Sequence, residues 1–356
     1  MTSVPDPHFW RNRRVLLTGH TGFKGAWAAL WLHEMGARVT GLSLAPETKP
    51  NLFESANVGA QVDSQILDIR DAASIRAIVK RAEPEIILHM AAQALVRRSY
   101  REPADTFATN VMGTINVLDA ARELTNLKAC LVVTSDKVYD NDGTGHAFRE
   151  GEKLGGHDPY SASKAAADIV AASYRLSFFS GEKAKLATAR GGNVIGGGDF
   201  SEDRIVPDIW RAHESGKPLV LRYPDATRPW QHVLDCLSGY FVFAEKLATG
   251  QVDEPALNFG PHGRESRPVR DVVTAMQRAI GASEGWEQAP GPLPKEMPAL
   301  ELSCERAEQV LHWRSHLDAR KSIAWTADWY KTFAAGGDMK AFTLRQIADF
   351  ATLAHA

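Results

Sequence analysis

The feature that most constrains the fold is the glycine-rich stretch Thr18–Gly25, which reads Thr-Gly-His-Thr-Gly-Phe-Lys-Gly. An apolar run of strand character, 15–17, precedes it, and an apolar segment of helical character, 26–35, follows it. Glycines allow a tight turn and the close approach of a pyrophosphate, while a helix N-terminus offers unpaired N–H donors. This order predicts the opening of a dinucleotide-binding βαβ unit, and not a Walker loop, because no Gly-Lys-Ser/Thr closes it. The residues predicted to contact the cofactor here are Gly19, His20, Thr21, Gly22, Phe23, Lys24 and Gly25.

Short apolar runs alternate with helical segments through the first half of the chain. Strands are expected at 38–42, 65–67, 85–89, 129–133 and 184–189, and helices at 72–82, 103–124 and 160–178. Continuous apolar runs indicate strands that are buried on both faces of a parallel sheet. The sequence therefore predicts an α/β protein with a doubly wound parallel sheet of Rossmann type.

This rhythm changes after Arg190. The glycine-rich run 191–198 is predicted to be a flexible loop on the substrate side. Beyond it we expect strands at 219–221 and 256–259, helices at 205–213, 233–247 and 269–280, a linker at 281–298 and a short helical tail. The prediction is a cofactor domain at 1–190 and a smaller α/β substrate lobe at 191–356, partly interleaved with the first.

Composition excludes several classes of protein. The net charge of −2 argues against nucleic-acid binding, which requires a basic face. Cys130, Cys236 and Cys304 lie far apart, so the sequence predicts neither a zinc site nor disulfides. Without a signal core or a membrane-spanning apolar run, we expect a cytoplasmic protein that does not bind a membrane. The small basic cluster Arg97, Arg98 and Arg101 is interpreted as a solvated face or an interface.

The sharpest chemical pattern is Tyr160 and Lys164. At this spacing on a helix, the two side chains share one face. A lysine ammonium beside a phenol favours the phenolate, so we expect the pKa of Tyr160 to be lowered towards neutrality. Ser135, after the strand 129–133, adds a hydroxyl at the same edge of the sheet.

Cofactor choice is left open by the residues themselves. An NAD-specific unit often ends its second strand with an acid that binds the ribose, but Ser43, Leu44 and Ala45 follow the strand here. Neither an acid nor an arginine is present, so the pattern does not separate NAD from NADP. Ala91, Ala92 and Gln93 follow the fourth strand, where small residues allow a cofactor to pass close to the backbone.

The glycine turn, Ser135 and the Tyr160/Lys164 pair together resemble the extended short-chain dehydrogenase/reductase family. Within it, the segment 134–139 resembles the active-site strand end of sugar-nucleotide 4,6-dehydratases, which carry Thr-Asp-Glu there. A lysine in place of the glutamate, here Lys137, is typical of the members that act on CDP-glucose. The segments 155–161, 190–199 and 228–233 also resemble those members, and the resemblance runs from about Trp10 to the C-terminus.

This resemblance implies NAD as cofactor and CDP-glucose as substrate. Carbon 4 would be oxidised, water eliminated across carbons 5 and 6, and hydride returned to carbon 6, giving CDP-4-keto-6-deoxyglucose for deoxysugar synthesis in bacterial surface polysaccharide. Tyr160 would accept the proton of the 4-hydroxyl, Lys164 would bind the nicotinamide ribose, and Ser135 would hydrogen-bond the 4-oxygen. Asp136 would protonate the departing 6-hydroxyl, which requires a buried, neutral carboxyl.

Other roles follow from the same resemblance. Lys137 is either a base that has lost its proton or a charged group that stabilises the enolate. Asp68 and Ile69 would contact the adenine, while Arg228, Arg204 and Asn193 would contact the substrate, Arg228 at the diphosphate. The family pairs subunits through helices here at about 103–124 and 160–178, so a homodimer or homotetramer is expected.

The sequence also allows other functions. A sugar-nucleotide 4-epimerase would need Tyr160 and Lys164 but not Asp136 and Lys137, and a dehydratase could act on a different nucleotide sugar. A non-catalytic cofactor sensor would have no need of Tyr160.

Overall fold

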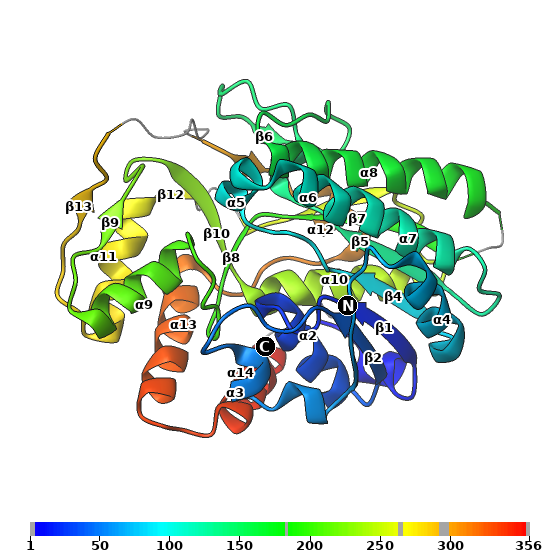
Figure 1. The fold of residues 1–356 in the computed structure, drawn as a ribbon, viewed down its shortest axis with the longest axis horizontal. Coiled ribbons are helices and arrows are strands. Elements are labelled where there is room, and N and C mark those ends of the chain that lie inside the picture. Colours follow the sequence, from blue (N-terminus) through cyan, green and yellow to red (C-terminus); the bar gives the residue numbers. More distant parts are fainter. Residues whose placement is uncertain (1–3, 182–183, 263–265, 292–298, 354–356) are drawn as a thin grey trace.

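The centre of the molecule is a seven-stranded parallel sheet with the strand order β11-β7-β5-β4-β1-β2-β3 (Figure 1). The computed structural model describes residues 4–181, 184–262, 266–291 and 299–353. Its sheet strands are β1 Arg14–Thr18, β2 Arg38–Ser43, β3 Asp63–Ile66, β4 Ile86–His89, β5 Ala129–Val133, β7 Lys185–Gly191 and β11 Ala256–Phe259. The order reverses between β1 and β4, which is where doubly wound sheets bind ligands. The Rossmann-type prediction is confirmed.

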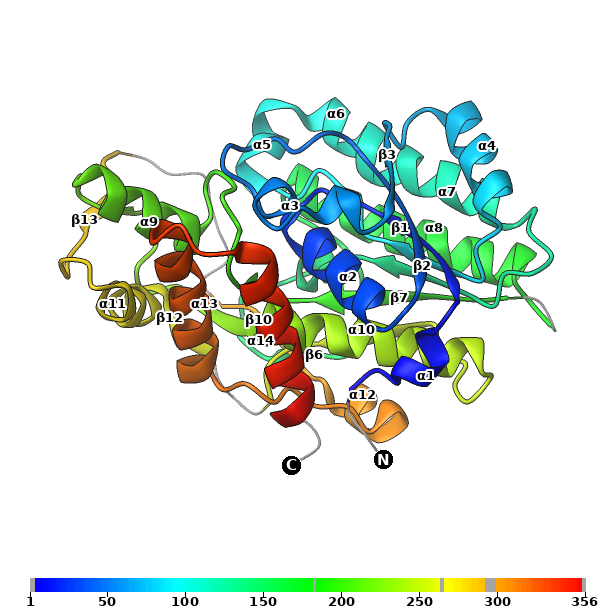
Figure 2. The ribbon, with the colours of Figure 1, turned by 90° about the horizontal axis from the view of Figure 1, so that it is seen from below.

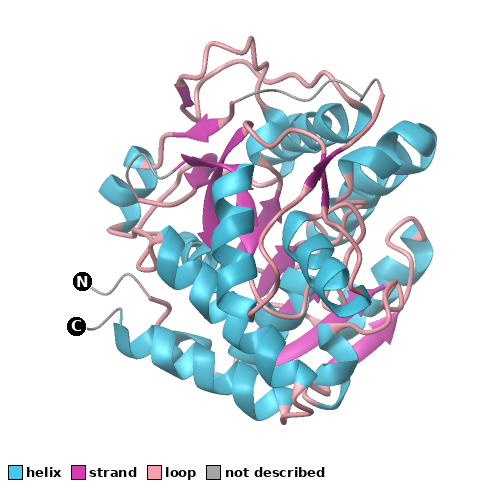
Figure 3. Ribbon diagram, turned by 90° about the vertical axis from the view of Figure 1, so that its left-hand side faces the viewer, coloured by secondary structure: helices cyan, strands magenta, loops and turns pink. Residues whose placement is uncertain are grey.

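Helices cover both faces of the sheet (Figure 3). Val15 and Leu17 of β1 pack into one core, with α2 Phe23–Glu34 and α10 Val233–Ala248. Leu16 points to the opposite core, with α4 Ala72–Ala82, α7 Gly113–Ala121 and α8 Pro159–Phe178. Because successive side chains of a strand alternate in direction, an unbroken apolar run can supply both cores.

The predicted helix 103–124 is interrupted. α6 Pro103–Phe107 leads into a π-helical turn, Ala108–Met112, before α7 begins. π turns insert an extra residue into a helix and often occur at functional sites. Periodicity alone did not reveal it, since the flanking segments are ordinary α-helix.

The smaller lobe departs from the prediction in three places. The run 191–198 is not simply a loop, because β8 Asn193–Ile195 pairs with β10 Thr227–His232, which pairs with β12 Ser266–Pro268. Strand 256–259 is β11, the edge of the main sheet, and not part of the lobe. The linker contains β13 Glu287–Gln288, paired with β9 Val220–Leu221, and its residues 292–298 lie outside the described part of the chain.

The remaining elements complete the lobe and the periphery. They are α1 Pro7–Trp10, α3 Leu52–Ser55, α5 Val96–Arg101, α9 Ile205–Ser215, α11 Val269–Ile280, α12 Glu305–Leu311, α13 Ala319–Ala334, α14 Met339–Leu353, β6 Ala147–Phe148, β14 Glu301–Leu302 and 3₁₀ turns at Val58–Ala60 and Asp136–Val138. α14 packs against α2 and α13 on one side of the molecule (Figure 2). Within the described ranges, no helix combines the length and the apolar character that crossing a membrane requires.

A buried ion pair fastens α8 to the sheet. Arg190, in β7, donates from Nε and Nη2 to the two carboxylate oxygens of Asp168 at 2.9 and 2.8 Å. Thr134 and Thr188 also donate to this carboxylate, at 2.9 and 3.2 Å. Both charged side chains are buried, with exposed fractions of 5% and 4%. Bidentate geometry and the extra hydrogen bonds offset the cost of removing the charges from water.

Breaking this pair from one side is expected to destabilise the fold strongly. Arg190→Met should lower the free energy of unfolding by about 3–5 kcal/mol, because it strands the Asp168 carboxylate in the core. Adding Asp168→Asn should recover more than half of that loss. Arg122→Gln, which breaks an exposed pair with Asp119, serves as the control and should cost less than about 1 kcal/mol. Urea titration followed by circular dichroism measures all three, and equal losses for the single and double variants would contradict the account.

Candidate active site

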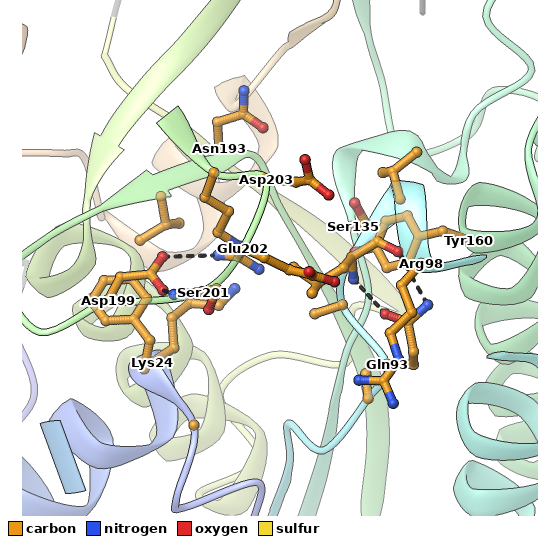
Figure 4. A pocket seen from close by; sticks show the side chains of 18 of the residues that line it. Lys24, Gln93, Arg98, Ser135, Tyr160, Asn193, Asp199, Ser201, Glu202 and Asp203 are labelled. Atoms are coloured by element: carbon orange, nitrogen blue, oxygen red, sulfur yellow. Dashed lines mark hydrogen bonds and ion pairs between the residues drawn. The ribbon is translucent and has the colours of Figure 1, made fainter. Parts of the chain in front are cut away.

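A cavity of about 1260 Å³ opens at the carboxyl ends of the central strands. Its walls come from the glycine turn before α2, the residues after β4 and β5, the start of α8, and the lobe elements β8, β9, β10 and α9. Figure 4 shows side chains from both halves of the chain converging on this space. Its volume exceeds that of a usual small-molecule pocket, so it has room for two ligands.

The glycine turn has the shape that a dinucleotide requires. Gly19 has a φ of +82°, and a Cβ there would lie 2.8 Å from the amide nitrogen of Ala91. A Cβ on Gly25 would lie 1.9 Å from the carbonyl oxygen of Gly19, so only glycine lets α2 begin this close to the turn. Gly22 caps α2 without a side chain, which leaves the first N–H groups of the helix open to an anion. These residues fit the pyrophosphate of a dinucleotide.

Most of the predicted cofactor residues line the cavity. They are Gly19, Thr21, Gly22, Phe23, Lys24, Gly25, Asp68, Ile69, Ala91, Ala92 and Gln93. His20 is the exception, because its ring is buried and forms a hydrogen bond with Ser64 of β3 at 2.7 Å. Burial lowers the pKa of His20 to about 4. At the end of β2, Ser43 bonds Thr21 at 2.8 Å instead of presenting an acid. Asp68 is held by Arg70, whose hydrogen bonds lower the pKa of that carboxyl.

The prediction that Lys164 lowers the pKa of Tyr160 towards neutrality is wrong for this structure. Lys164 donates from Nζ to the carbonyl oxygen of Val133 at 2.8 Å. Burial, together with the charge of Lys24, lowers the pKa of Lys164 to about 7. Burial raises the pKa of Tyr160 to about 12, against the opposing effect of a hydrogen bond with Ser135. Desolvation of the phenol therefore outweighs the stabilisation of its anion, although both side chains line the same cavity.

Ser135, Asp136 and Lys137 form the floor beside Tyr160. Asp136 is 1% exposed, and its Oδ1 accepts hydrogen bonds from Ser135 at 2.9 Å and from Lys137 Nζ at 3.3 Å. Its Oδ2 is buried and has no hydrogen-bond partner within the described structure. Lys137 Nζ also donates to Asn193 Oδ1 at 3.3 Å, which links the floor to β8. A hydroxyl, a carboxyl and an ammonium thus face one space with one carboxyl oxygen available to a ligand.

Two positioning residues carried no recognised signal in the sequence. The π turn directs Asn110 inward, where it bonds the backbone N–H and carbonyl of Gln93 and the hydroxyl of Ser163 at 2.8–3.0 Å. Ser99, in α5, accepts a hydrogen bond from the backbone N–H of Tyr160 at 3.1 Å. Together they fix the start of α8 against the end of β4.

The predicted substrate residues line the lobe side of the cavity. Asn193 lies in β8, Arg204 is the N-cap of α9, and Arg228 lies in β10, buried to 8% exposure. Arg204 pairs with Asp199 at 3.4 Å. Lys24 reaches the same region from α2, with Nζ 5.9 Å from the ring centroid of Tyr240, and burial lowers its pKa. In Figure 4, Lys24 and Asp199 lie on one side of the space and Tyr160 and Gln93 on the other.

The arginine cluster of α5 is not a simple solvated face. Arg97 pairs with Asp203 at 2.9 Å, and Arg101 pairs with Glu202 at 2.6 Å, both across to the segment before α9. Arg98 pairs with Glu47 at 2.9 Å, on the loop after β2. Arg97 and Arg98 line the cavity, so this cluster forms part of its rim.

The sequence is similar to those of known nucleotide-sugar dehydratases along most of its length. A family model described as GDP-mannose 4,6 dehydratase matches residues 16–324. The CDP-glucose 4,6-dehydratase of Salmonella typhimurium strain LT2 is 42% identical over 351 residues, covering 97% of this chain and 98% of that protein.

Solved structures share the fold. The dTDP-glucose 4,6-dehydratase of Bacillus anthracis in complex with NAD matches with a TM-score of 0.76 at 22% identity, covering 91% of this chain and 98% of that one. The UDP-glucose 4-epimerase of Thermus thermophilus, also in complex with NAD, matches with a TM-score of 0.77 at 25% identity, covering 89% and 99%. Since the family model spans most of the sequence and the Salmonella relative is similar along its whole length, the chain belongs to the GDP-mannose 4,6-dehydratase family.

Proposed function

We propose that this chain is an NAD-dependent CDP-glucose 4,6-dehydratase that converts CDP-glucose to CDP-4-keto-6-deoxyglucose. The observation that carries the proposal is Asp136, buried beside Ser135, with its Oδ2 unpartnered among the described residues of the cavity that also holds Tyr160 and Lys164. A redox reaction alone needs the hydroxyl and the tyrosine, whereas elimination of water needs an additional acid. The full-length similarity to the Salmonella enzyme supports CDP-glucose as the substrate.

Each side chain then has one task. When bound, NAD supplies reversible two-electron redox chemistry at carbons 4 and 6 of the hexose. Tyr160, as the phenolate, takes the proton of the 4-hydroxyl, and Ser135 holds the 4-oxygen by a hydrogen bond. The hydrogen bond with Ser135 and the charge of Arg204 favour that anion against the burial that raises the pKa of Tyr160. Asp136 gives a proton to the 6-hydroxyl as it leaves, which the 4-ketone permits by acidifying the hydrogen on carbon 5. Lys164, held by Val133, binds the nicotinamide ribose.

For Lys137 we propose the charged role. Its ammonium donates to Asp136 Oδ1 and to Asn193 Oδ1, each at 3.3 Å, and so faces the cavity from its floor. A cation there stabilises the enolate that forms when the hydrogen of carbon 5 is removed. A water molecule or another group takes that hydrogen as a proton, and a proton returns to carbon 5 when carbon 6 is reduced.

The division of labour and the assembly are part of the same proposal. Residues 1–190 bind the cofactor, and 191–356, except for β11 in the main sheet, supply the substrate lobe, with Asn193, Arg204 and Arg228 on the nucleotide sugar. Subunits associate through α6–α8, where apolar side chains are unusually exposed. These are Phe107, Met112, Ile169, Leu176 and Phe178.

Substrate identity is tested with a panel of nucleotide sugars. Incubation with CDP-, dTDP-, GDP- and UDP-hexoses, followed by mass spectrometry, should show the loss of one water from CDP-glucose only, without net consumption of cofactor. A conversion without mass change would indicate an epimerase. Water loss from another nucleotide sugar would keep the chemistry and overturn the specificity.

Asp136→Asn separates dehydration from epimerisation. The amide cannot donate a proton as an acid does, so kcat for water loss should fall by about 10²–10⁴. Reduction of bound NAD by CDP-glucose, followed by its near-ultraviolet absorbance in a single turnover, should persist because Tyr160 and Ser135 are intact. Tyr160→Phe, as the comparison, should abolish both signals. Full dehydratase activity in the Asn variant would rule out the assigned role of Asp136.

The assembly is tested at α8. Leu176 is 73% exposed and Ile169 57% exposed, so Ile169→Glu with Leu176→Glu should dissociate the oligomer by placing charges in an apolar interface. Sedimentation velocity should show the wild-type chain as a dimer or tetramer and the double variant as a monomer. Val220→Glu, at an exposed site in β9 of the lobe, should leave assembly unchanged. A monomeric wild-type chain would contradict the proposal.

A further inference from the structure

Two guanidinium groups from opposite sides of the cavity meet at one carboxylate. Arg97 of α5 and Arg222, just after β9, both bond Asp203 Oδ1, at 2.9 and 3.1 Å. All three residues line the cavity. The Asp203 side chain is 22% exposed, so the site is partly shielded from water.

The cluster of Arg97, Arg222 and Asp203 shares its cavity with Tyr160. Arg204, which follows Asp203, is close enough for its charge to lower the pKa of Tyr160 against the larger effect of burial. Burial raises the pKa of Asp208 in α9, against the opposing effects of Arg211 and Arg222. The cluster therefore lies in the wall of the cavity that also contains Tyr160, directly beside Arg204, one of the predicted substrate residues.

The segment carrying Asp203 is anchored on its own. The carbonyl oxygen of Asp199 accepts a hydrogen bond from Tyr330. Arg211 donates to the carbonyl oxygens of Phe200 and Ser201, each at 3.0 Å. Asp203 itself has a φ of +58°, a left-handed conformation that aspartate and asparagine tolerate better than most residues. The backbone of this segment is thus fixed by contacts other than the two ion pairs, so the ion pairs can break while the segment stays in place.

We propose that Arg97 and Arg222, in addition to Arg228, bind the diphosphate of the nucleotide sugar, and that Asp203 occupies this phosphate subsite until the substrate displaces the carboxylate. A guanidinium binds carboxylate and phosphate with the same planar donor geometry, so one anion can replace the other. This inference rests on the proposed function for the class of ligand. Substrate binding is then an exchange of ion pairs, in which the attraction between the arginines and Asp203 is lost when phosphate binds.

The decisive variant is Asp203→Asn, which removes the competing charge and keeps a residue that tolerates the left-handed conformation. Calorimetry with CDP should show about 3- to 10-fold tighter binding than for the wild-type chain, since two partly exposed ion pairs no longer have to be broken. Cytidine, which has no phosphate, should bind both proteins equally. Glu202→Gln is the matched control, because it removes a neighbouring acid that pairs with Arg101 instead, and it should leave CDP affinity unchanged.

A second pair of variants tests the arginines themselves. Arg97→Gln and Arg222→Gln should each weaken CDP binding about 10-fold and make it less dependent on salt concentration, while cytidine binding stays constant. Weaker CDP binding by Asp203→Asn would overturn the exchange and identify Asp203 as a structural clamp. Parallel changes for CDP and cytidine would also overturn it. Failure of the wild-type chain to bind CDP at all would refute the proposed function, and the inference with it.

Discussion

The buried pair between Asp168 and Arg190 is the interaction on which the geometry of the site depends. Asp168 lies one helical turn after Lys164 on α8, and Arg190 lies where β7 leaves the sheet for the smaller lobe. The same carboxylate holds Thr134, which directly precedes Ser135. One ion pair thus fixes three components relative to one another: the helix with the tyrosine and lysine, the strand end with the hydroxyl and acid, and the entry to the lobe.

The net charge of the chain does not reflect the charges that line its cavity. A net charge of −2 describes an almost neutral protein, yet lysines and arginines from several elements face the same space. Most are matched by a nearby acid, as Arg204 is by Asp199 and Arg97 by Asp203. Such matching keeps the cavity compatible with a folded chain before an anionic ligand arrives, and it leaves the ligand to compete with the protein's own carboxylates.

The main sheet could be predicted from the sequence because its strands are continuous apolar runs and its first turn needs glycine. Ser135 and Asp136 fall at the carboxyl edge of the sheet for a related reason, since parallel strands present their carboxyl ends together, and Lys164 follows Tyr160 by one turn of α8. Other features depend on tertiary contacts. Strand 256–259 is too short to reveal which sheet it joins, and the environment that raises the pKa of Tyr160 is formed by burial. The ion pair between Arg97 and Asp203 could not be predicted, because the two residues meet only when segment 199–204 folds against α5.

The π-helical turn at Ala108–Met112 makes the site sensitive to the length of the chain. Each residue advances a helix by about 100° of rotation. Removing one residue from the turn would restore regular α-helix and swing Asn110 away from Gln93 and Ser163, while the apolar stripe of α7 could stay in register with the sheet. This deletion would therefore disturb the active site far more than the fold. The extra residue acts as a spacer that positions Asn110, and the packing of α7 on the sheet does not depend on it.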